Sequence, residues 1–214
     1  MSPVIDYDLC MNKTLYYVHD PMCSWCWGFR PVWKEICKNL PENIEIKYIL
    51  GGLAPDSDDP MSEEMKLEIA GYWRKVQKHI PDTEFNFDFW TKCIPKRSTY
   101  PACRAVIATK EQNPSLEKEI ISAIQASYYL QAKNPSENEV LIAIAVSLGL
   151  DENRFIEDLS SAKTQKKLDE DIVFSRQIGA QGFPSMILGD EAGYQYVPLN
   201  YNDARSSLEF IVAS

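Results

Sequence analysis

Two cysteines, Cys23 and Cys26, separated by Ser24 and Trp25, are the residues of this chain best suited to chemistry. Two thiols at this spacing, between a strand-like run and an apolar-periodic stretch, are typical of a redox-active pair. If a helix begins at or near Cys23, its unpaired N–H groups and positive dipole end stabilise a thiolate there. Cys26 then lies one turn further in, on the same face and within reach of Cys23. An exposed, activated thiolate beside a resolving thiol is what thiol–disulfide exchange requires.

Two other interpretations of the pair are structural. A zinc site needs a matching second half, and the other thiols and imidazoles form no second close pair: Cys10, Cys37, Cys93, Cys103, His19 and His79. The pair could instead be buried packing cysteines, because cysteine is a common core residue. We expect Cys26 to be buried and Cys23, at a helix start, to be exposed. The pattern therefore favours redox chemistry that needs no metal and no bound cofactor.

The composition is that of a globular protein with an acidic surface. The 214 residues are 45% apolar, enough for one large domain or two lobes, and the formal net charge is -9. This charge argues against nucleic acid and against an anionic membrane surface as partners. The longest purely apolar run, residues 140–146, is too short to span a bilayer. The composition does not predict an oligomeric state.

The first residues lack the features of an export signal. Residues 1–13 contain Asp6 and Asp8, without a basic segment or an apolar one. Six cysteines in such a chain fit a reducing compartment better than a disulfide framework. We therefore expect a cytoplasmic protein.

The elements around the cysteine pair indicate a βαβ unit. Residues 14–19 and 44–50 have strand character, and the stretch between them has helical periodicity. A strand–helix–strand unit places its two strands parallel through a right-handed crossover. Residues 186–188 and 194–197 indicate a later β-hairpin, and Asn202 is positioned to cap a final helix.

The middle of the chain is predicted to be helical. Ser62 and Asp151 are expected N-caps, and helices are also expected to begin at residues 99–101 and at 113–114. Ser136 and Glu139 match a capping box before residues 140–148, which are apolar almost all round and therefore predict a central helix. Residues 84–96 are rich in aromatic side chains and predict no clear element.

The chain resembles the DsbA family, and more narrowly its FrnE-like disulfide-isomerase branch. The resemblance rests on Asp-Pro-Met-Cys-Ser-Trp-Cys-Trp-Gly-Phe at residues 20–29 and Gly-Phe-Pro-Ser at 182–185, in that order. It implies an α/β thioredoxin-like fold interrupted by an inserted all-helical domain. Residues 14–54 and 175–214 would form the thioredoxin-like domain and residues 55–174 the insertion.

The resemblance also implies roles for single residues. Cys23 would be the nucleophile and Cys26 the resolving thiol, and Pro184 would be cis and face the disulfide. The dipeptide Ser24-Trp25 differs from the Pro-His of periplasmic oxidants and from the Gly-Pro of thioredoxin. Because this dipeptide influences the reduction potential, the direction of electron flow stays open.

Phe183, Pro184 and Trp25 are the expected substrate-binding residues. A proline cannot donate to a sheet ladder, so Pro184 is expected at the start of a strand. Phe183 could then offer its N–H and C=O to an extended substrate segment. Trp25 could form an apolar rim around the pair. The structural alternatives are an ordinary trans-proline turn and a tryptophan that packs against the helical block.

Four further residues could take part in the chemistry. Cys103 lies near an expected helix start, so its thiol could be activated, and with Cys93 it could form a second redox pair. His19 and Asp20 precede the pair closely enough to tune the pKa of Cys23.

Together these features predict a thiol–disulfide oxidoreductase or protein disulfide isomerase acting on protein or small-molecule thiols and disulfides. One alternative is a glutathione-dependent transferase or isomerase of the kappa or 2-hydroxychromene-2-carboxylate isomerase type. Such enzymes use a single nucleophile or bound glutathione, so the second cysteine counts against them. Another alternative is a non-enzymatic module that binds zinc or a polypeptide.

Overall fold

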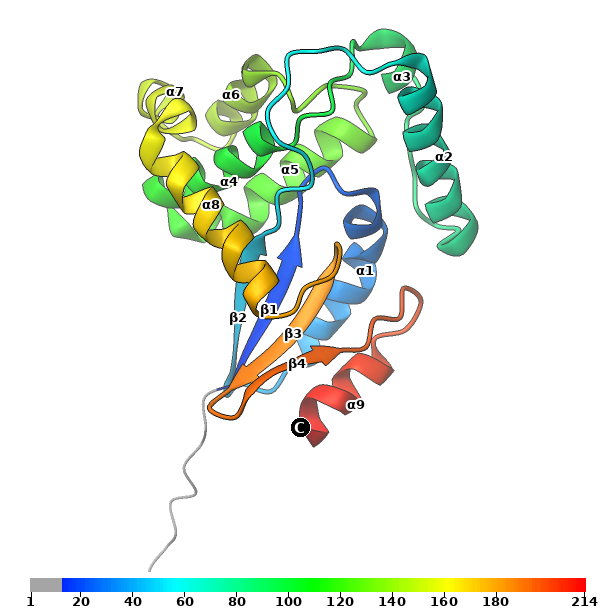
Figure 1. Cartoon of the computed structure of the whole chain (residues 1–214), viewed down its shortest axis with the longest axis vertical. Coiled ribbons are helices and arrows are strands. Elements are labelled where there is room, and N and C mark those ends of the chain that lie inside the picture. The colour runs from blue at the N-terminus through cyan, green and yellow to red at the C-terminus, as the bar shows by residue number, and fades with distance from the viewer. Residues whose placement is uncertain (1–12) are drawn as a thin grey trace, which may run out of the picture.

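A four-stranded sheet forms the base of the molecule (Figure 1). The structure, a computed structural model, describes residues 13–214. Cys10 lies outside that range, as do residues 1–12 of the segment 1–13 on which the expectation about an export signal rests. The strands are β1 (Lys13–His19), β2 (Ile44–Leu50), β3 (Ser185–Asp190) and β4 (Gly193–Val197), in the order β2-β1-β3-β4. β1 runs parallel to β2 and antiparallel to β3, and β3 forms a hairpin with β4. The predicted parallel pair and hairpin are confirmed.

Helices cover both faces of this sheet. α1 (Ser24–Asn39) and α9 (Arg205–Ala213) lie on one face, and the end of α8 (Ala162–Gln177) lies on the other (Figure 1). Successive strand residues point to opposite faces. Leu15 and Tyr17 therefore join the core under α1 and α9, whereas Val18 joins a smaller cluster with Ile178 at the end of α8.

A helical lobe stands at the carboxyl ends of β1 and β2 (Figure 1). It contains α2 (Glu63–His79), α3 (Phe89–Lys92), α4 (Tyr100–Gln112), the 3-10 turn η1 (Pro114–Leu116), α5 (Glu117–Tyr129), α6 (Asn138–Ser147) and α7 (Glu152–Ser160). Its core continues into α1 through Trp27, whose ring stacks on Tyr129 at 5.2 Å between centroids. The lobe is thus packed directly on the helix that begins at the cysteine pair.

The aromatic-rich stretch of residues 84–96 is a loop around the short helix α3. The rings of Phe85, Phe87, Phe89 and Trp90 surround Trp73 of α2, with centroids between 4.9 and 5.8 Å from its ring. Local periodicity gave no signal here because these rings, of which only Phe89 is fully buried, pack on α2 and not on a neighbouring turn of their own element.

Two predicted details of the lobe are wrong. Glu137, not Ser136, is the N-cap of α6, because the Ser136 hydroxyl donates to the carbonyl of Ser98 at 2.6 Å. α6 is also not central: within it only Leu141 and Ala145 are buried, and Val146 is 45% exposed. The central helix is α4, which contacts α5, α6, α7 and α8.

Of the other expected helix caps, two are confirmed and one is wrong. Ser62 and Asp151 cap α2 and α7 as predicted, each accepting from the backbone N–H three residues later. Asn202 does not cap α9, which has Ala204 at its N-cap position.

α8 runs through the boundary between residues 174 and 175, so its last turn continues from the lobe onto the sheet. Within the described range, no helix is both long enough and apolar enough to cross a membrane.

Candidate active site

Cys23 occupies the N-cap position of α1. The N–H of Cys23 donates to the carbonyl of Asp20 at 3.0 Å, which closes the turn after β1. Its Sγ accepts a hydrogen bond from the N–H of Cys26 at 3.4 Å. A helix N-terminus offers unpaired N–H groups to a negative sulfur. The prediction that the helix begins at Cys23 is confirmed.

Cys26 lies one turn inside α1, beneath Cys23. Its side chain is 1% exposed, and burial raises its pKa well above the ordinary value, with a further contribution from the Cys23 thiol. Both sulfurs are free thiols. The pair is therefore unequal: one sulfur has helix N–H support and the other is held neutral in the core.

The expectation that Cys23 is exposed is wrong, because its side chain is only 6% exposed. Two segments distant in sequence, residues 51–53 and 181–183, line the same cavity as Cys23. The Cys23 thiol donates to the carbonyl of Phe183 at 3.3 Å. The sulfur is reached through this cavity and not from the open surface.

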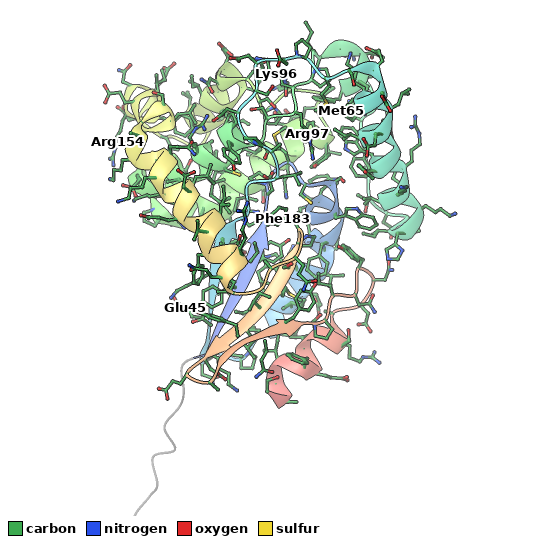
Figure 2. The ribbon with its side chains drawn as sticks, viewed as in Figure 1. Glu45, Met65, Lys96, Arg97, Arg154 and Phe183 are labelled. Atoms are coloured by element: carbon green, nitrogen blue, oxygen red, sulfur yellow. The ribbon has the colours of Figure 1, made fainter. Side chains whose placement is uncertain are left out.

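The cavity has a volume of about 540 Å³ and lies between the lobe and the end of the sheet. On the lobe side its wall is largely apolar, with Met61, Ile69, Tyr72, Trp73 and Tyr128. The opposite wall is formed by residues 51–53, 175–176 and 180–183. Figure 2 shows Arg97 on the lobe side and Phe183 near the end of the sheet.

The predicted substrate residues are placed unequally. Phe183 and Trp25 line the cavity together with Cys23. Pro184 is buried and precedes β3, and the Phe183–Pro184 peptide bond is cis. The Trp25 ring contacts those of His79 at 5.8 Å and Tyr201 at 5.1 Å, measured between centroids. Trp25 thus both lines the cavity and packs against the lobe.

The cavity wall carries positive charge. Lys96, Arg97 and Arg176 line it, and no carboxylate residue does, although the chain has a net charge of -9. Lys96 is paired with Glu137 at 3.3 Å. Arg97 and Arg176 form no ion pair with any residue the structure describes. A ligand with a carboxylate group fits such a wall.

Asp20 is a buried carboxylate that ties the turn to the lobe. It is fully buried and accepts from the N–H of Met22 at 2.8 Å, the N–H of Leu53 at 2.7 Å and the hydroxyl of Thr99 at 2.7 Å. Burial is the main cause that raises the pKa of Asp20, and these hydrogen bonds offset part of the effect. Asp20 therefore fixes the segment before Cys23 to the loop after β2 and to the start of α4.

Cys103 and Cys93 have separate partners. Cys103 is fully buried in α4, its thiol lies 3.5 Å from a carboxylate oxygen of Asp20, and burial raises its pKa well above the ordinary value. The predicted activation of Cys103 is wrong, because the thiol lies inside the first turn of α4 and faces the core. The Cys93 thiol donates to the carbonyl of Ala132 at 3.1 Å, and both cysteines are free.

His19 has a packing role. Its ring is 1% exposed, stacks on Tyr17 at 5.4 Å and meets Tyr48 edge-on at 5.7 Å. Neither ring nitrogen has a hydrogen-bond partner among the described residues. Burial is the main cause that lowers the pKa of His19 to about 3.

This burial predicts a pH dependence of stability. The unfolded chain takes up a proton at His19 near pH 6.5, whereas the folded chain does so only near pH 3. The free energy of unfolding should therefore fall as the pH is lowered through this window. Replacing the ring by one that does not titrate, His19→Phe, should flatten the dependence. Urea titrations at several pH values between 4 and 7 give the free energy of unfolding at each pH. If this free energy changes with pH equally in both proteins, the assignment to His19 is contradicted.

Sequence reasoning missed the residues that complete the cavity. Gly51, Arg97, Thr99 and Arg176 come from loops and helix ends far from the cysteine pair. The one local signal for these residues is the glycine pair Gly51-Gly52, which follows the strand-like residues 44–50. Among residues 13–214 no group of three or more His, Cys, Asp or Glu side chains is arranged to hold a metal ion.

A sequence profile of the thioredoxin family matches residues 16–202. Among curated proteins, the chain is similar to the ClpXP adapter protein SpxH of Halalkalibacterium halodurans, with 23% identity over 177 residues, 81% of this chain and 57% of the relative. It is also 24% identical to SpxH of Bacillus subtilis over 173 residues, 80% of this chain and 56% of the relative. The chain thus spans little more than half the length of these two relatives.

Solved structures with the same fold are disulfide-handling proteins by name. A candidate protein disulfide isomerase from Nitrosomonas europaea superposes with a TM-score of 0.80 and 26% identity, covering 94% of this chain and 96% of that one. The cytosolic disulfide reductase DsbM from Pseudomonas aeruginosa gives a TM-score of 0.73 and 19% identity, covering 94% and 95%. The fold is therefore the DsbA-like form of the thioredoxin fold with a helical insertion.

The profile match extends from the second half of β1 to the segment before α9 and so includes the whole lobe as well as the sheet. The chain belongs to the thioredoxin family.

Proposed function

We propose that this protein is a cytoplasmic thiol–disulfide oxidoreductase whose Cys23 and Cys26 exchange with protein or small-molecule disulfides. One observation carries the proposal: the Cys23 sulfur lies at a helix N-terminus, on the wall of a cavity, and accepts the N–H of the buried Cys26 one helical turn further in. A single-thiol transferase would have no use for the second sulfur at this place. The fold shared with a cytosolic disulfide reductase supports the same assignment.

The reaction proceeds in two exchanges. The Cys23 thiolate attacks one sulfur of the substrate disulfide, forms a mixed disulfide and releases the other sulfur as a thiolate. Cys26 loses its proton and attacks the Cys23 sulfur, which releases the second substrate thiol. The Cys23–Cys26 pair is then oxidised and the substrate has been reduced by two electrons. Oxidation of a substrate dithiol is the reverse sequence.

Phe183 and Trp25 contact the substrate in this proposal. The Phe183 carbonyl, 3.3 Å from the Cys23 sulfur, lies where a segment attached to the attacked sulfur must pass. Pro184 leads into β3 and has no N–H to donate to the sheet. The backbone edge at Phe183 is therefore left free to pair with a substrate segment. The ring of Trp25 adds an apolar side to the same cavity.

The positive wall favours disulfides that carry carboxylates, of which glutathione disulfide is a small example. The structure of DsbM has also been solved with glutathione, at a TM-score of 0.70 and 20% identity to this chain. The test mixes reduced protein with glutathione disulfide and follows the oxidation of the Cys23–Cys26 pair by mass spectrometry. Varying the ratio of reduced to oxidised glutathione gives the reduction potential of the pair. A pair that never oxidises would overturn the proposal.

Arg97 and Arg176 are expected to recognise the carboxylates. A charge-assisted contact at a partly exposed site is worth about 1 kcal/mol, which corresponds to about a five-fold change in affinity. Arg97→Ala and Arg176→Ala should each raise KM for glutathione disulfide by about that factor and leave the uncharged bis(2-hydroxyethyl) disulfide unaffected. Arg205→Ala, an exposed arginine on α9 outside the cavity, is the matched control. Equal effects on both disulfides would exclude carboxylate recognition by these two residues.

A polypeptide-binding role, as in an adapter, is the second candidate. The apolar wall of Met61, Ile69 and Tyr72 favours it, as do the sequence relatives named as adapter proteins. Two results together would assign this role: the unmodified protein shows no thiol–disulfide exchange, and a variant that lacks both Cys23 and Cys26 still binds peptides.

A further inference from the structure

Gly51 lies at the end of β2, on the floor of the candidate active site. Its N–H donates to the carbonyl of His19 at 2.8 Å, so it extends the pairing of β1 and β2 by one residue. Its backbone does not adopt the left-handed conformation, in contrast to Gly52, whose φ is 63°. Backbone geometry therefore does not explain why residue 51 is a glycine.

The space above Gly51 does explain it. A Cβ atom at this position would lie 1.8 Å from Cε1, 2.2 Å from Cζ and 2.7 Å from Cδ1 of Phe183. These distances are far below van der Waals contact, so the Phe183 ring occupies the place where any other residue would put its side chain. A substitution at residue 51 must displace the ring.

The ring cannot move without consequences. It packs on a buried cluster that contains Val18, Ile49 and Ile178, and it would leave this apolar surface when displaced. The backbone of Phe183 supplies the carbonyl to which the Cys23 thiol donates at 3.3 Å. Two residues later Ser185 is already paired with Val18 in the sheet. Rearrangement is therefore confined to the few residues around that carbonyl.

We infer that Gly51 is a positioning residue for thiol–disulfide exchange: the absence of a side chain seats the Phe183 ring and thereby holds the Phe183 carbonyl against the Cys23 sulfur. The inference deepens the proposed function and rests on it, because it assigns the residue that shapes the substrate path beside Cys23. Gly51 itself touches neither sulfur nor substrate in this arrangement.

The test is a double-mutant cycle with Gly51→Ala, Phe183→Ala and the double variant. Small misplacements of a reacting group cost one or two orders of magnitude in rate. Gly51→Ala should therefore lower kcat/KM for glutathione disulfide by about ten-fold or more. In the Phe183→Ala background the ring is gone, and the same glycine substitution should change kcat/KM by less than about two-fold. Gly71→Ala, at a helical glycine with nothing within 4 Å of the added Cβ, is the matched control and should leave activity unchanged.

A second measurement separates positioning from general damage to the fold. The pH profile of Cys23 alkylation by iodoacetamide should move to lower pH in Gly51→Ala, because a thiol that loses its carbonyl acceptor gives up its proton more readily. The profile of the double variant should equal that of Phe183→Ala. If Gly51→Ala does not fold, recovery of folding in the double variant supports the same contact.

Two results would overturn the inference. One is a Gly51→Ala effect of equal size with and without the Phe183 ring; the other is an unchanged alkylation profile together with unchanged kcat/KM. If the unmodified protein shows no exchange at all, the proposed function fails. The alkylation profiles of the same four proteins still decide whether Gly51 positions the Phe183 carbonyl.

Discussion

Cys23→Ser is expected to reduce thiol–disulfide exchange to the uncatalysed level, whereas Cys26→Ser should still attack and accumulate mixed disulfides. Cys23 lines the cavity and receives the N–H of Cys26, so it is the sulfur a substrate can reach. Cys26 is 1% exposed, and burial raises its pKa, so it reacts only with a disulfide already formed on Cys23. Loss of the Cys23 sulfur stops the reaction, whereas loss of the Cys26 sulfur stops only the release of the substrate from the mixed disulfide.

The measurement is mass spectrometry of each variant after incubation with glutathione disulfide. The Cys26→Ser protein should carry one glutathione on Cys23, and the Cys23→Ser protein none at either position. Cys37→Ser removes a thiol at the other end of α1 and is the control with unchanged exchange. Iodoacetamide labelling of the reduced protein at mildly acidic pH should mark Cys23 first; preferential labelling of Cys26 would reverse the assignment.

Asp20→Ala is expected to lower the free energy of unfolding by about 3 kcal/mol. Two effects oppose each other here. Removing the carboxylate relieves the cost of a buried charge, but it leaves the buried N–H of Met22 and the half-buried N–H of Leu53 without an acceptor. Each orphaned group costs about 1–3 kcal/mol, and the deleted side chain also leaves a void. The loss of acceptors therefore outweighs the relief of charge. Urea unfolding of the reduced proteins at neutral pH measures the difference.

Asp20→Asn should cost less than Asp20→Ala and should alter the pH dependence. The pKa of Asp20 is raised, so above the ordinary value of 3.8 the folded chain holds this proton more firmly than the unfolded chain. The contribution of Asp20 to the free energy of unfolding therefore falls as the pH rises from 3.8 through the raised pKa. An asparagine does not titrate, so the Asp20→Asn variant should lack this part of the pH dependence. Asp88→Ala, which removes an exposed partner of Lys92, is the control and should stay within about 0.5 kcal/mol. A similar loss in both alanine variants would mean that Asp20 is not the tie between turn and lobe.

The residue pattern alone determined the elements whose signals are local. Strand-like residues at 14–19 and 44–50 indicated β1 and β2, and the helix between them predicted that the two strands pair in parallel. The change from a strand-like run to an apolar-periodic stretch placed Cys23 at or near a helix start, and the spacing of three residues placed Cys26 one turn further in. Ser62 and Asp151 were identified as caps because a capping side chain reaches only three residues along its own chain.

Only the tertiary structure decided which residues meet at the candidate site. Phe183 lies 160 residues from Cys23, and its carbonyl meets the sulfur because β3 pairs with β1. The low exposure of Cys23 and the positive wall with Arg97 depend on how the lobe packs on the sheet, whereas the position of α6 depends on how the helices of the lobe pack on one another. Gly51 is the clearest case: a glycine after a strand predicts a turn, yet here it makes room for a ring that arrives from the far end of the chain. Contacts of this kind are set by close packing between distant segments, and periodicity along the chain carries no record of them.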